Sequence, residues 1–265
     1  MRAADYPYFD APFLALAHRG GALYGPNRHR ENTRYAFEQA YALGYRWFET
    51  DVHATADGVL LAFHDDRLDR VTAGHGLIGE LPYAAVQGEL IGDQDPIPTL
   101  DELLESFPDV RFNIDAKAPR AVPLLAEAIA THQAYERVCV SSFGIRRLHA
   151  LRRLLGPRVA SAASSLGVGW NRFAPAVTRL LSSPAPALQM PLTFTVPLGN
   201  GRRRVVDALT PALLRSAHRA GKQVHIWTVD DAAVMHELVD RGVDGIFTDR
   251  IDTLKDVLVE RGLWA

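Results

Sequence analysis

Short apolar segments recur along the whole chain and alternate with segments in which apolar residues follow helical spacing. The short segments predict eight buried parallel strands, at 14–17, 47–52, 111–115, 138–140, 159–162, 187–190, 224–227 and 245–248. The intervening segments, among them 36–41, 124–129 and 213–217, predict amphipathic helices. Eight strand-helix units within 265 residues favour a closed (β/α)8 TIM barrel of the α/β class, and an open doubly wound sheet is the alternative.

Residues that begin or end helices punctuate this alternation. Asn32-Thr33 can cap the first helix, Pro211 suits a first helical turn, and Gly242 follows a helical stretch as a left-handed stop. The interval 65–98 breaks the pattern, because it contains several glycines and no sustained periodicity. We therefore expect one barrel domain over residues 1–265, with a small insertion after the second strand at about 65–98.

Charge and cysteine content limit the environment and the partners. The chain carries 29 Lys and Arg residues against 31 Asp and Glu, and a net charge of −2 gives no general attraction to nucleic acid or anionic lipid. Any recognition of phosphate must therefore be local. Cys139, in an apolar run, predicts a buried thiol and suits a reducing compartment. The apolar stretch 13–17 is too short to span a membrane, so we expect a cytoplasmic protein without an integral membrane segment.

Polar side chains cluster where the predicted strands end. In a parallel barrel the chemistry lies at the carboxyl ends of the strands. The polar and aromatic residues predicted to lie at these ends are His18, Arg19, Glu49, Asp51, His64, Asp65, Asp115, Lys117, Ser141, Ser142, Gln189 and Trp227. We expect them to converge on one cavity.

Glu49 and Asp51 suggest a cation site. They stand two residues apart on one predicted strand, so their carboxylates project to the same side and repel unless a cation or a proton lies between them. Asp115 and Lys117 repeat this spacing on the next strand. A site made only of oxygen ligands suits Mg²⁺ or Ca²⁺ rather than zinc. The alternative is an ion-paired barrel interior in which Lys117 neutralises one of the acids.

A tight turn and a short motif supply two histidines. Asp57 and Gly58 are typical of a two-residue hairpin loop, whose register would place His64 opposite Asp51. His18 and Arg19 end the first strand, where histidine can move a proton and arginine can bind phosphate through its planar fork of donors. Together these residues are what metal-assisted cleavage of a phosphodiester requires.

Two further features allow more than one interpretation. Trp227 could form a wall of a substrate cleft, or it could pack in the core. Arg202, Arg203 and Arg204 follow Gly201 and most simply indicate a charged hairpin edge, although an anionic headgroup is an alternative partner. The glycines match neither a Walker loop nor a dinucleotide fingerprint, so neither ATP nor NAD is expected.

An ordered set of motifs resembles the glycerophosphodiester phosphodiesterase family. The resemblance covers most of the chain, and the set is far more specific than any of its parts. The motifs are His18-Arg19-Gly20, Glu31-Asn32-Thr33, Glu49 with Asp51, Asp57-Gly58, His64-Asp65, Trp227-Thr228-Val229 and the stretch 242–249.

The resemblance implies a role for each matched residue. His18 and His64 would be the acid-base pair, Arg19 and Lys117 would contact phosphate, and Glu49, Asp51 and Asp115 would hold the metal. The family usually has Glu where this chain has Asp115, and Asn where it has Asp230. The shorter Asp115 carboxylate would favour a longer or water-mediated contact with the ion. The small insertion would shape the substrate entrance.

The resemblance implies hydrolysis of glycerophosphodiesters to glycerol 3-phosphate and an alcohol, with a small molecule as the partner. A lysophospholipase D acting on lysophospholipids is a close alternative and would need an apolar groove at the barrel mouth. A non-catalytic barrel that binds phosphate esters is a second alternative, but such a protein would be expected to lose His18, His64, Glu49 or Asp51, and all four are present. No feature of the sequence indicates an oligomeric state.

Overall fold

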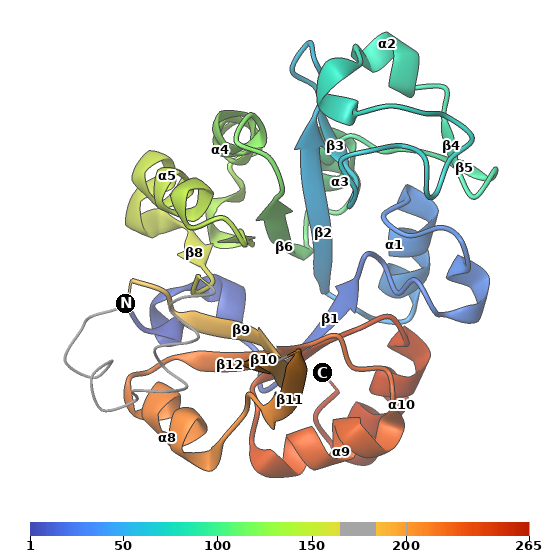
Figure 1. Cartoon of the computed structure of the whole chain (residues 1–265). Helices are drawn as coiled ribbons and strands as arrows, with labels where there is room; N and C mark the ends of the chain where they lie inside the picture. Colours follow the sequence, from blue (N-terminus) through green and yellow to red (C-terminus); the bar gives the residue numbers. More distant parts are fainter. Residues whose placement is uncertain (165–183, 200, 265) are drawn as a thin grey trace.

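The computed structural model describes residues 1–164, 184–199 and 201–264, and its centre is a ring of eight parallel strands (Figure 1). Their spatial order is β8-β7-β6-β2-β1-β13-β12-β9, and a parallel bridge from Ala162 to Ala187 joins the two edges. This bridge nearly closes the barrel and confirms the predicted TIM barrel over an open sheet. The strands are β1 (Leu14–His18), β2 (Trp47–Ala54), β6 (Arg111–Ala116), β7 (Val138–Ser141), β8 (Ala160–Ser161), β9 (Ala187–Pro191), β12 (Gln223–Trp227) and β13 (Gly245–Thr248).

Helices surround the strands (Figure 1). They are α1 (Arg34–Ala42), α3 (Leu100–Ser106), α4 (Ala121–Thr131), α5 (Ile145–Leu155), α8 (Pro211–Arg219), α9 (Ala232–Arg241) and α10 (Ile251–Glu260), with short 3-10 turns at Ala3–Asp5, Pro7–Phe9, Gly25–Asn27, Ala134–Glu136 and Gly156–Arg158. The predicted helix ends are confirmed: the Thr33 hydroxyl accepts a hydrogen bond from the Ala36 amide, Pro211 opens α8, and Gly242 ends α9 in the left-handed conformation.

Alternation along the strands divides the core into two layers. In β1, Ala15 and Ala17 face the layer between barrel and helices, whereas Leu14 and Leu16 face the barrel interior. The interior layer includes Cys139, whose thiol is buried as predicted, and burial raises its pKa well above the usual value. Aliphatic and aromatic side chains, among them Leu14, Leu16 and Phe247, therefore fill the barrel interior next to the polar site.

The hairpin that follows β2 contains a longer loop than the sequence predicts. The amide of Thr55 donates to the carbonyl of Val59 at 2.9 Å, and Gly58 adopts a φ of 91°. These contacts enclose three residues, 56–58, in the manner of a type I turn followed by a left-handed residue. The Thr55 hydroxyl, which donates to Asp57 at 2.6 Å, stabilises this wider turn.

The wider loop shifts the register by one residue. Val52 of β2 pairs with Ala62 of β3 (Leu60–Ala62), and the amide of Phe63 donates to the Asp51 carbonyl. The predicted pairing of His64 with Asp51 is therefore wrong. His64 lies one position beyond that pairing and still reaches the cavity at the barrel mouth.

The segment after β3 builds a small layer of its own on one side of the barrel, where Figure 1 shows α2, β4 and β5 together. It contains a 3-10 turn at Ile78–Glu80, α2 (Tyr83–Val86), β4 (Leu90–Ile91) and β5 (Asp95–Pro96). Its buried apolar side chains are Leu61, Phe63, Leu68, Ile78, Val86, Ile91 and Ile97. Because Leu61 and Phe63 belong to the hairpin, this layer is anchored to β2. That residues 1–265 form one domain stays a prediction.

A second hairpin follows β9. Strands β10 (Thr193–Gly199) and β11 (Arg202–Asp207) pair antiparallel outside the barrel sheet, and Arg202, Arg203 and Arg204 are exposed on it, as the predicted hairpin edge requires. Across the described ranges, no helix combines the length and the apolar character that crossing a bilayer demands.

Gly245 allows three barrel strands to approach closely. A Cβ at this position would lie 2.8 Å from the Leu14 carbonyl oxygen and 3.1 Å from the His225 ring. We expect Gly245→Ala to lower the free energy of unfolding by about 1–3 kcal/mol, as overpacking does. Urea denaturation measures this, with Gly88→Ala, where the new methyl group meets nothing within 4 Å, as the control. Equal stability of the two variants would contradict the close approach.

Candidate active site

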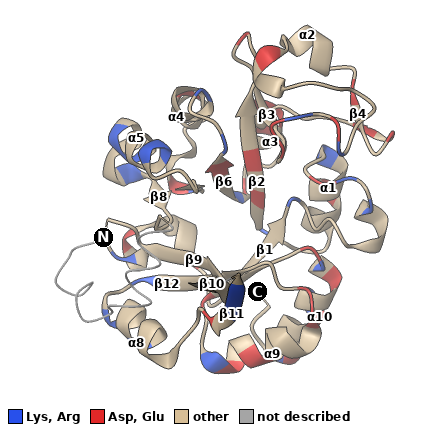
Figure 2. Cartoon of the chain, in the orientation of Figure 1, with Lys and Arg blue, Asp and Glu red and all other residues tan. Residues whose placement is uncertain are grey.

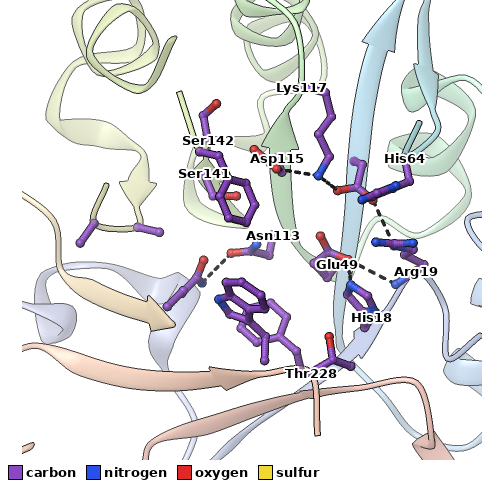
Figure 3. Close-up of a pocket in the computed structure, with 17 residues that line it drawn as sticks. His18, Arg19, Glu49, His64, Asn113, Asp115, Lys117, Ser141, Ser142 and Thr228 are labelled. Carbon is purple, nitrogen blue, oxygen red and sulfur yellow. Dashed lines mark hydrogen bonds and ion pairs between the residues drawn. The ribbon is translucent and has the colours of Figure 1, made fainter. Parts of the chain in front are cut away.

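A cavity of about 210 Å³ opens at the carboxyl ends of the barrel strands (Figure 3). All eight residues to which the sequence assigns a site role line it: His18, Arg19, Glu49, Asp51, His64, Asp115, Lys117 and Trp227. Figure 3 shows His18, Arg19, Glu49 and His64 on one side of the cavity and Ser141 and Ser142 on the other. Eleven of the twelve residues predicted to converge line this cavity, whereas Asp65 contacts His64 from outside the lining. The chemical roles of these residues stay predictions.

Two adjacent strands bring the carboxylates together. Asp51 of β2 lies beside Asp115 of β6 in the parallel register, and Glu49 lies two residues before Asp51 on the same strand. All three side chains are almost completely buried. The Lys117 ammonium lies between the two aspartates, 2.7 Å from Asp51 Oδ1 and 2.9 Å from Asp115 Oδ2. This part of the site thus matches the ion-paired arrangement that the sequence left as an alternative.

Arg19 reaches the same carboxylates from β1. Its φ of 50° turns the backbone so that its amide donates to Glu49 Oε2 at 3.3 Å. Its guanidinium lies 3.3 Å from Asp51 Oδ2 and 3.3 Å from Glu31 Oε1. Asp51 is therefore in contact with both cations, Lys117 and Arg19, so its negative charge is stabilised more than that of Glu49 or Asp115.

This unequal pairing separates the pKa values of the three acids. Burial and the nearby Asp51 charge raise the pKa of Glu49 to about 7. Burial also acts on Asp51, but Lys117 and Arg19 outweigh it and hold the Asp51 pKa below its usual value. For Asp115, burial outweighs the attraction of Lys117, so its pKa is raised. The site thus holds more negative charge than its two cations offset.

The donor atoms fit a divalent cation. Among the described residues, Asp115 Oδ1 is buried without a polar partner, whereas Asp51 Oδ2 and Asp115 Oδ2 are met by Arg19 and Lys117. Glu49 adds an acid with a raised pKa. An unsatisfied buried oxygen together with excess negative charge is what a hard cation neutralises. Within the described residues, however, no three acidic, histidine or cysteine side chains form a ready-made metal cage, and Lys117 lies between two of the acids.

Each cavity histidine is oriented by an aspartate. His18 Nδ1 lies 2.8 Å from Asp249 Oδ1, and His64 Nδ1 lies 2.6 Å from Asp65 Oδ1. Since a carboxylate accepts, each Nδ1 donates, and each Nε2 is left for proton exchange in the neutral ring. His18 Nε2 lies 3.7 Å from Glu49 Oε2. The two rings therefore share one hydrogen-bonding pattern.

Charge around His18 favours its protonated form. Burial lowers the pKa of His18, but Glu49 and the hydrogen bond to Asp249 outweigh it, and the net pKa is raised. Asp249 is itself held in place, because its amide donates to Asp230 Oδ1 at 2.8 Å. Asp230 thus fixes the backbone of Asp249, the residue that orients His18.

The His64 partner continues into a chain of ion pairs. Asp65 binds Arg70, and Arg70 donates to both oxygens of Glu31, at 2.6 and 2.9 Å. Glu31 in turn contacts Arg19. The segment after β3 is thereby tied to Arg19 as well as to the partner of His64.

Four residues of this site have no role predicted from the sequence: Asp65, Asp249, Arg70 and Phe143. Asp65 and Asp249 belong to quoted motifs, and Asp65 could have been found because it directly follows His64. Arg70 could not have been found, since it lies in a segment without periodicity. Phe143 packs edge-to-face on Trp227, with ring centroids 5.7 Å apart, and together they form an apolar wall. Trp227 therefore lines the cavity, as the cleft interpretation expects.

The cavity floor is polar and uncharged. Gln189 donates to Asn113 Oδ1 at 2.7 Å, and both residues line the cavity. His225 lies next to Gln189, and burial lowers its pKa to about 3, so its ring is neutral at physiological pH. The floor can therefore form hydrogen bonds without adding charge.

Comparisons with known proteins agree on one family. The model of the glycerophosphoryl diester phosphodiesterase family matches residues 18–253. A probable glycerophosphodiester phosphodiesterase 2 of Mycobacterium tuberculosis is 41% identical over 251 residues, which cover 95% of this chain and 92% of that protein. A lysophospholipase D of Mus musculus is 26% identical over 277 residues, which cover 92% of this chain and 85% of that protein.

A solved structure shares the fold. The Oleispira antarctica phosphodiesterase in complex with its product sn-glycerol-3-phosphate aligns with a TM-score of 0.78 at 24% identity. The alignment covers 96% of this chain and 99% of that one. At this identity the likeness supports the barrel architecture.

The raised pKa of Glu49 should make the metal-free protein less stable as the pH rises. A carboxyl with a folded pKa of about 7, against the usual 4.5, binds more protons folded than unfolded, so its contribution to stability is lost between about pH 4.5 and 7. The loss is at most about 3 kcal/mol. Urea denaturation in the presence of a chelator at pH 5 and pH 8 should show this loss in the wild type and not in Glu49→Gln.

Glu105→Gln is the matched control, because Glu105 is exposed on α3 and its loss changes the net charge equally. It should behave as the wild type does. A Glu49→Gln variant that declines as steeply as the wild type would contradict the assignment of the effect to Glu49.

Proposed function

The chain belongs to the glycerophosphoryl diester phosphodiesterase family, which makes it a phosphoric diester hydrolase, and we propose that it cleaves glycerophosphodiesters to glycerol 3-phosphate and an alcohol by histidine acid-base catalysis. One observation carries the proposal: two histidines, each held at Nδ1 by an aspartate, line one cavity together with Arg19 and Lys117.

His18 and His64 would move the protons. In-line displacement at phosphorus needs a base for the attacking oxygen and an acid for the leaving oxygen. Asp249 and Asp65 would orient the rings and stabilise the imidazolium that forms during the reaction. One ring would accept a proton at Nε2 from the attacking oxygen, while the other would donate a proton from Nε2 to the oxygen of the leaving alcohol.

Arg19 and Lys117 would bind the phosphoryl oxygens. Both cations line the cavity, and both are paired with carboxylates that compete for them. A phosphate that enters the cavity would meet donors already positioned by these acids, at little cost in reorganisation. Because the pKa of Lys117 is raised by Asp51 and Asp115 despite its burial, its amine stays charged at physiological pH.

Glu49, Asp51 and Asp115 would hold a divalent cation, Mg²⁺ or Ca²⁺. The unpaired Asp115 Oδ1 and the excess negative charge support this assignment. When bound, the ion would supply positive charge to the phosphoryl group in the transition state. The protein's own contribution is to bury the three acids together and to hold the Asp51 carboxylate charged through Lys117 and Arg19.

Hydrolysis of lysophospholipids at the same site is a second candidate. The apolar wall of Phe143 and Trp227 favours it, since 62% of the Phe143 side chain surface is exposed at the cavity mouth. A lysophospholipase D also stands among the relatives. Release of glycerol 3-phosphate from glycerophosphocholine, compared with release of choline from lysophosphatidylcholine, distinguishes the two substrates. The presence of both histidines and all three acids argues against a purely binding barrel.

Loss of either histidine should lower turnover strongly. We expect His18→Ala and His64→Ala each to reduce kcat for glycerophosphocholine by about 10²-fold or more, and the double variant to lose much less than the product of both, because the groups act as a unit. His75→Ala, at an exposed histidine, is the control. Two losses that simply multiplied would overturn the paired role.

Removal of the cation should abolish activity, and added Mg²⁺ or Ca²⁺ should restore it. Glu49→Gln and Asp51→Asn should weaken the ion's affinity by about 10-fold or more, since each removes a charged ligand. Calorimetric titration with each metal measures this directly. Asp66→Asn, an exposed neighbour of the site, should leave the affinity unchanged, and full activity after exhaustive chelation would refute the cation's role.

A further inference from the structure

Exposed apolar side chains lie on two elements that follow the carboxyl ends of barrel strands. In the described part of the chain, Phe143 is 62% and Ile145 37% exposed at the start of α5, while Leu198 is 58% and Val205 65% exposed on the β10–β11 hairpin. Large apolar residues exposed singly are ordinary, but several on two elements at one end of a barrel indicate an interaction surface. We call Phe143, Ile145, Arg146 and the hairpin residues Leu198 and 202–205 the rim.

Both parts of the rim lie at the catalytic end of the barrel. Phe143 follows the carboxyl end of β7, and the hairpin follows the carboxyl end of β9. Phe143 also packs on Trp227, whose strand position pairs with Pro191 directly before the hairpin. A surface that covers the rim would therefore face the opening of the cavity.

The rim is strongly basic although the protein is not. The rim contains four arginines, Arg146 and Arg202–204, and no acid, whereas the whole chain has a net charge of −2. Figure 2 shows this positive charge on α5 and on β11. Arg147 and Arg152 are used internally, on the Ala116 and Ala162 carbonyls. Arg146 and Arg202–204 are exposed and form no ion pair among the described residues.

We propose that the rim docks the barrel mouth onto an anionic phospholipid surface. Arginines interspersed with exposed Phe, Ile, Leu and Val match the chemistry of a membrane interface, where basic groups meet headgroup phosphates and apolar groups enter the acyl boundary. An acidic peptide or a nucleic acid would use the arginines but would leave these aliphatic side chains unpaired. Docking would present the cavity to phosphodiesters at the lipid surface.

Flotation with lipid vesicles tests the proposal without requiring catalysis. The full chain should bind vesicles of phosphatidylcholine mixed with phosphatidylglycerol, should not bind vesicles of phosphatidylcholine alone, and should be released by salt. Arg202→Gln with Arg203→Gln should weaken binding about 25-fold, from about fivefold for each arginine near the surface. Leu198→Ser should weaken it further by removing the apolar anchor.

Arg215→Gln with Arg219→Gln is the matched control, because it removes the same charge from exposed positions on α8. It should leave vesicle binding unchanged. Both double variants should hydrolyse soluble glycerophosphocholine as the wild type does, which shows that they are folded. No binding to anionic vesicles, equal losses in the two double variants, or binding to an acidic peptide or nucleic acid in place of vesicles would each overturn the proposal.

Discussion

Repulsion among three buried carboxylates is the constraint on which the rest of the site depends. Glu49, Asp51 and Asp115 lie in one cavity, and each would be costly to bury without a counter-charge. Lys117 and Arg19 supply two positive charges and direct them mainly to Asp51. Burial and the nearby Asp51 charge raise the pKa of Glu49, and Glu49 together with Asp249 raises that of His18. The excess negative charge suits a divalent cation.

The barrel makes such a concentration of charge possible. Its interior below the site is filled by apolar side chains such as Leu14 and Leu16, which provide a dry and rigid base. Parallel strands then present the acids side by side, and the loops add the groups that balance and orient them. Asp249 and Asp65 come from different parts of the chain, but each accepts a hydrogen bond from Nδ1 of one histidine. The two histidines are therefore oriented in the same way.

The loops on the two sides of the cavity differ in their contacts with the rest of the protein. The segment after β3 is tied to the site through Arg70, Asp65 and Glu31. The opposite wall, with Phe143 and the β10–β11 hairpin, instead exposes apolar and basic side chains. One side of the mouth therefore serves the acid-base machinery, and the other is suited to contact with a large external surface.

The sequence by itself predicted the barrel and eight of the residues that line the cavity. Short apolar runs and helical spacing identify strands and helices locally, and residues at the carboxyl ends of parallel strands must meet at one end of the barrel. Only the tertiary structure decided which charges pair. Asp249 reaches His18 across 231 positions, and the Lys117 pairing with Asp51 depends on the register between β2 and β6. Even in the local hairpin after β2, the observed register differs by one residue from the predicted register, because a side-chain hydrogen bond from Thr55 favours the wider loop. Such contacts depend on distances between elements, which local patterns do not specify.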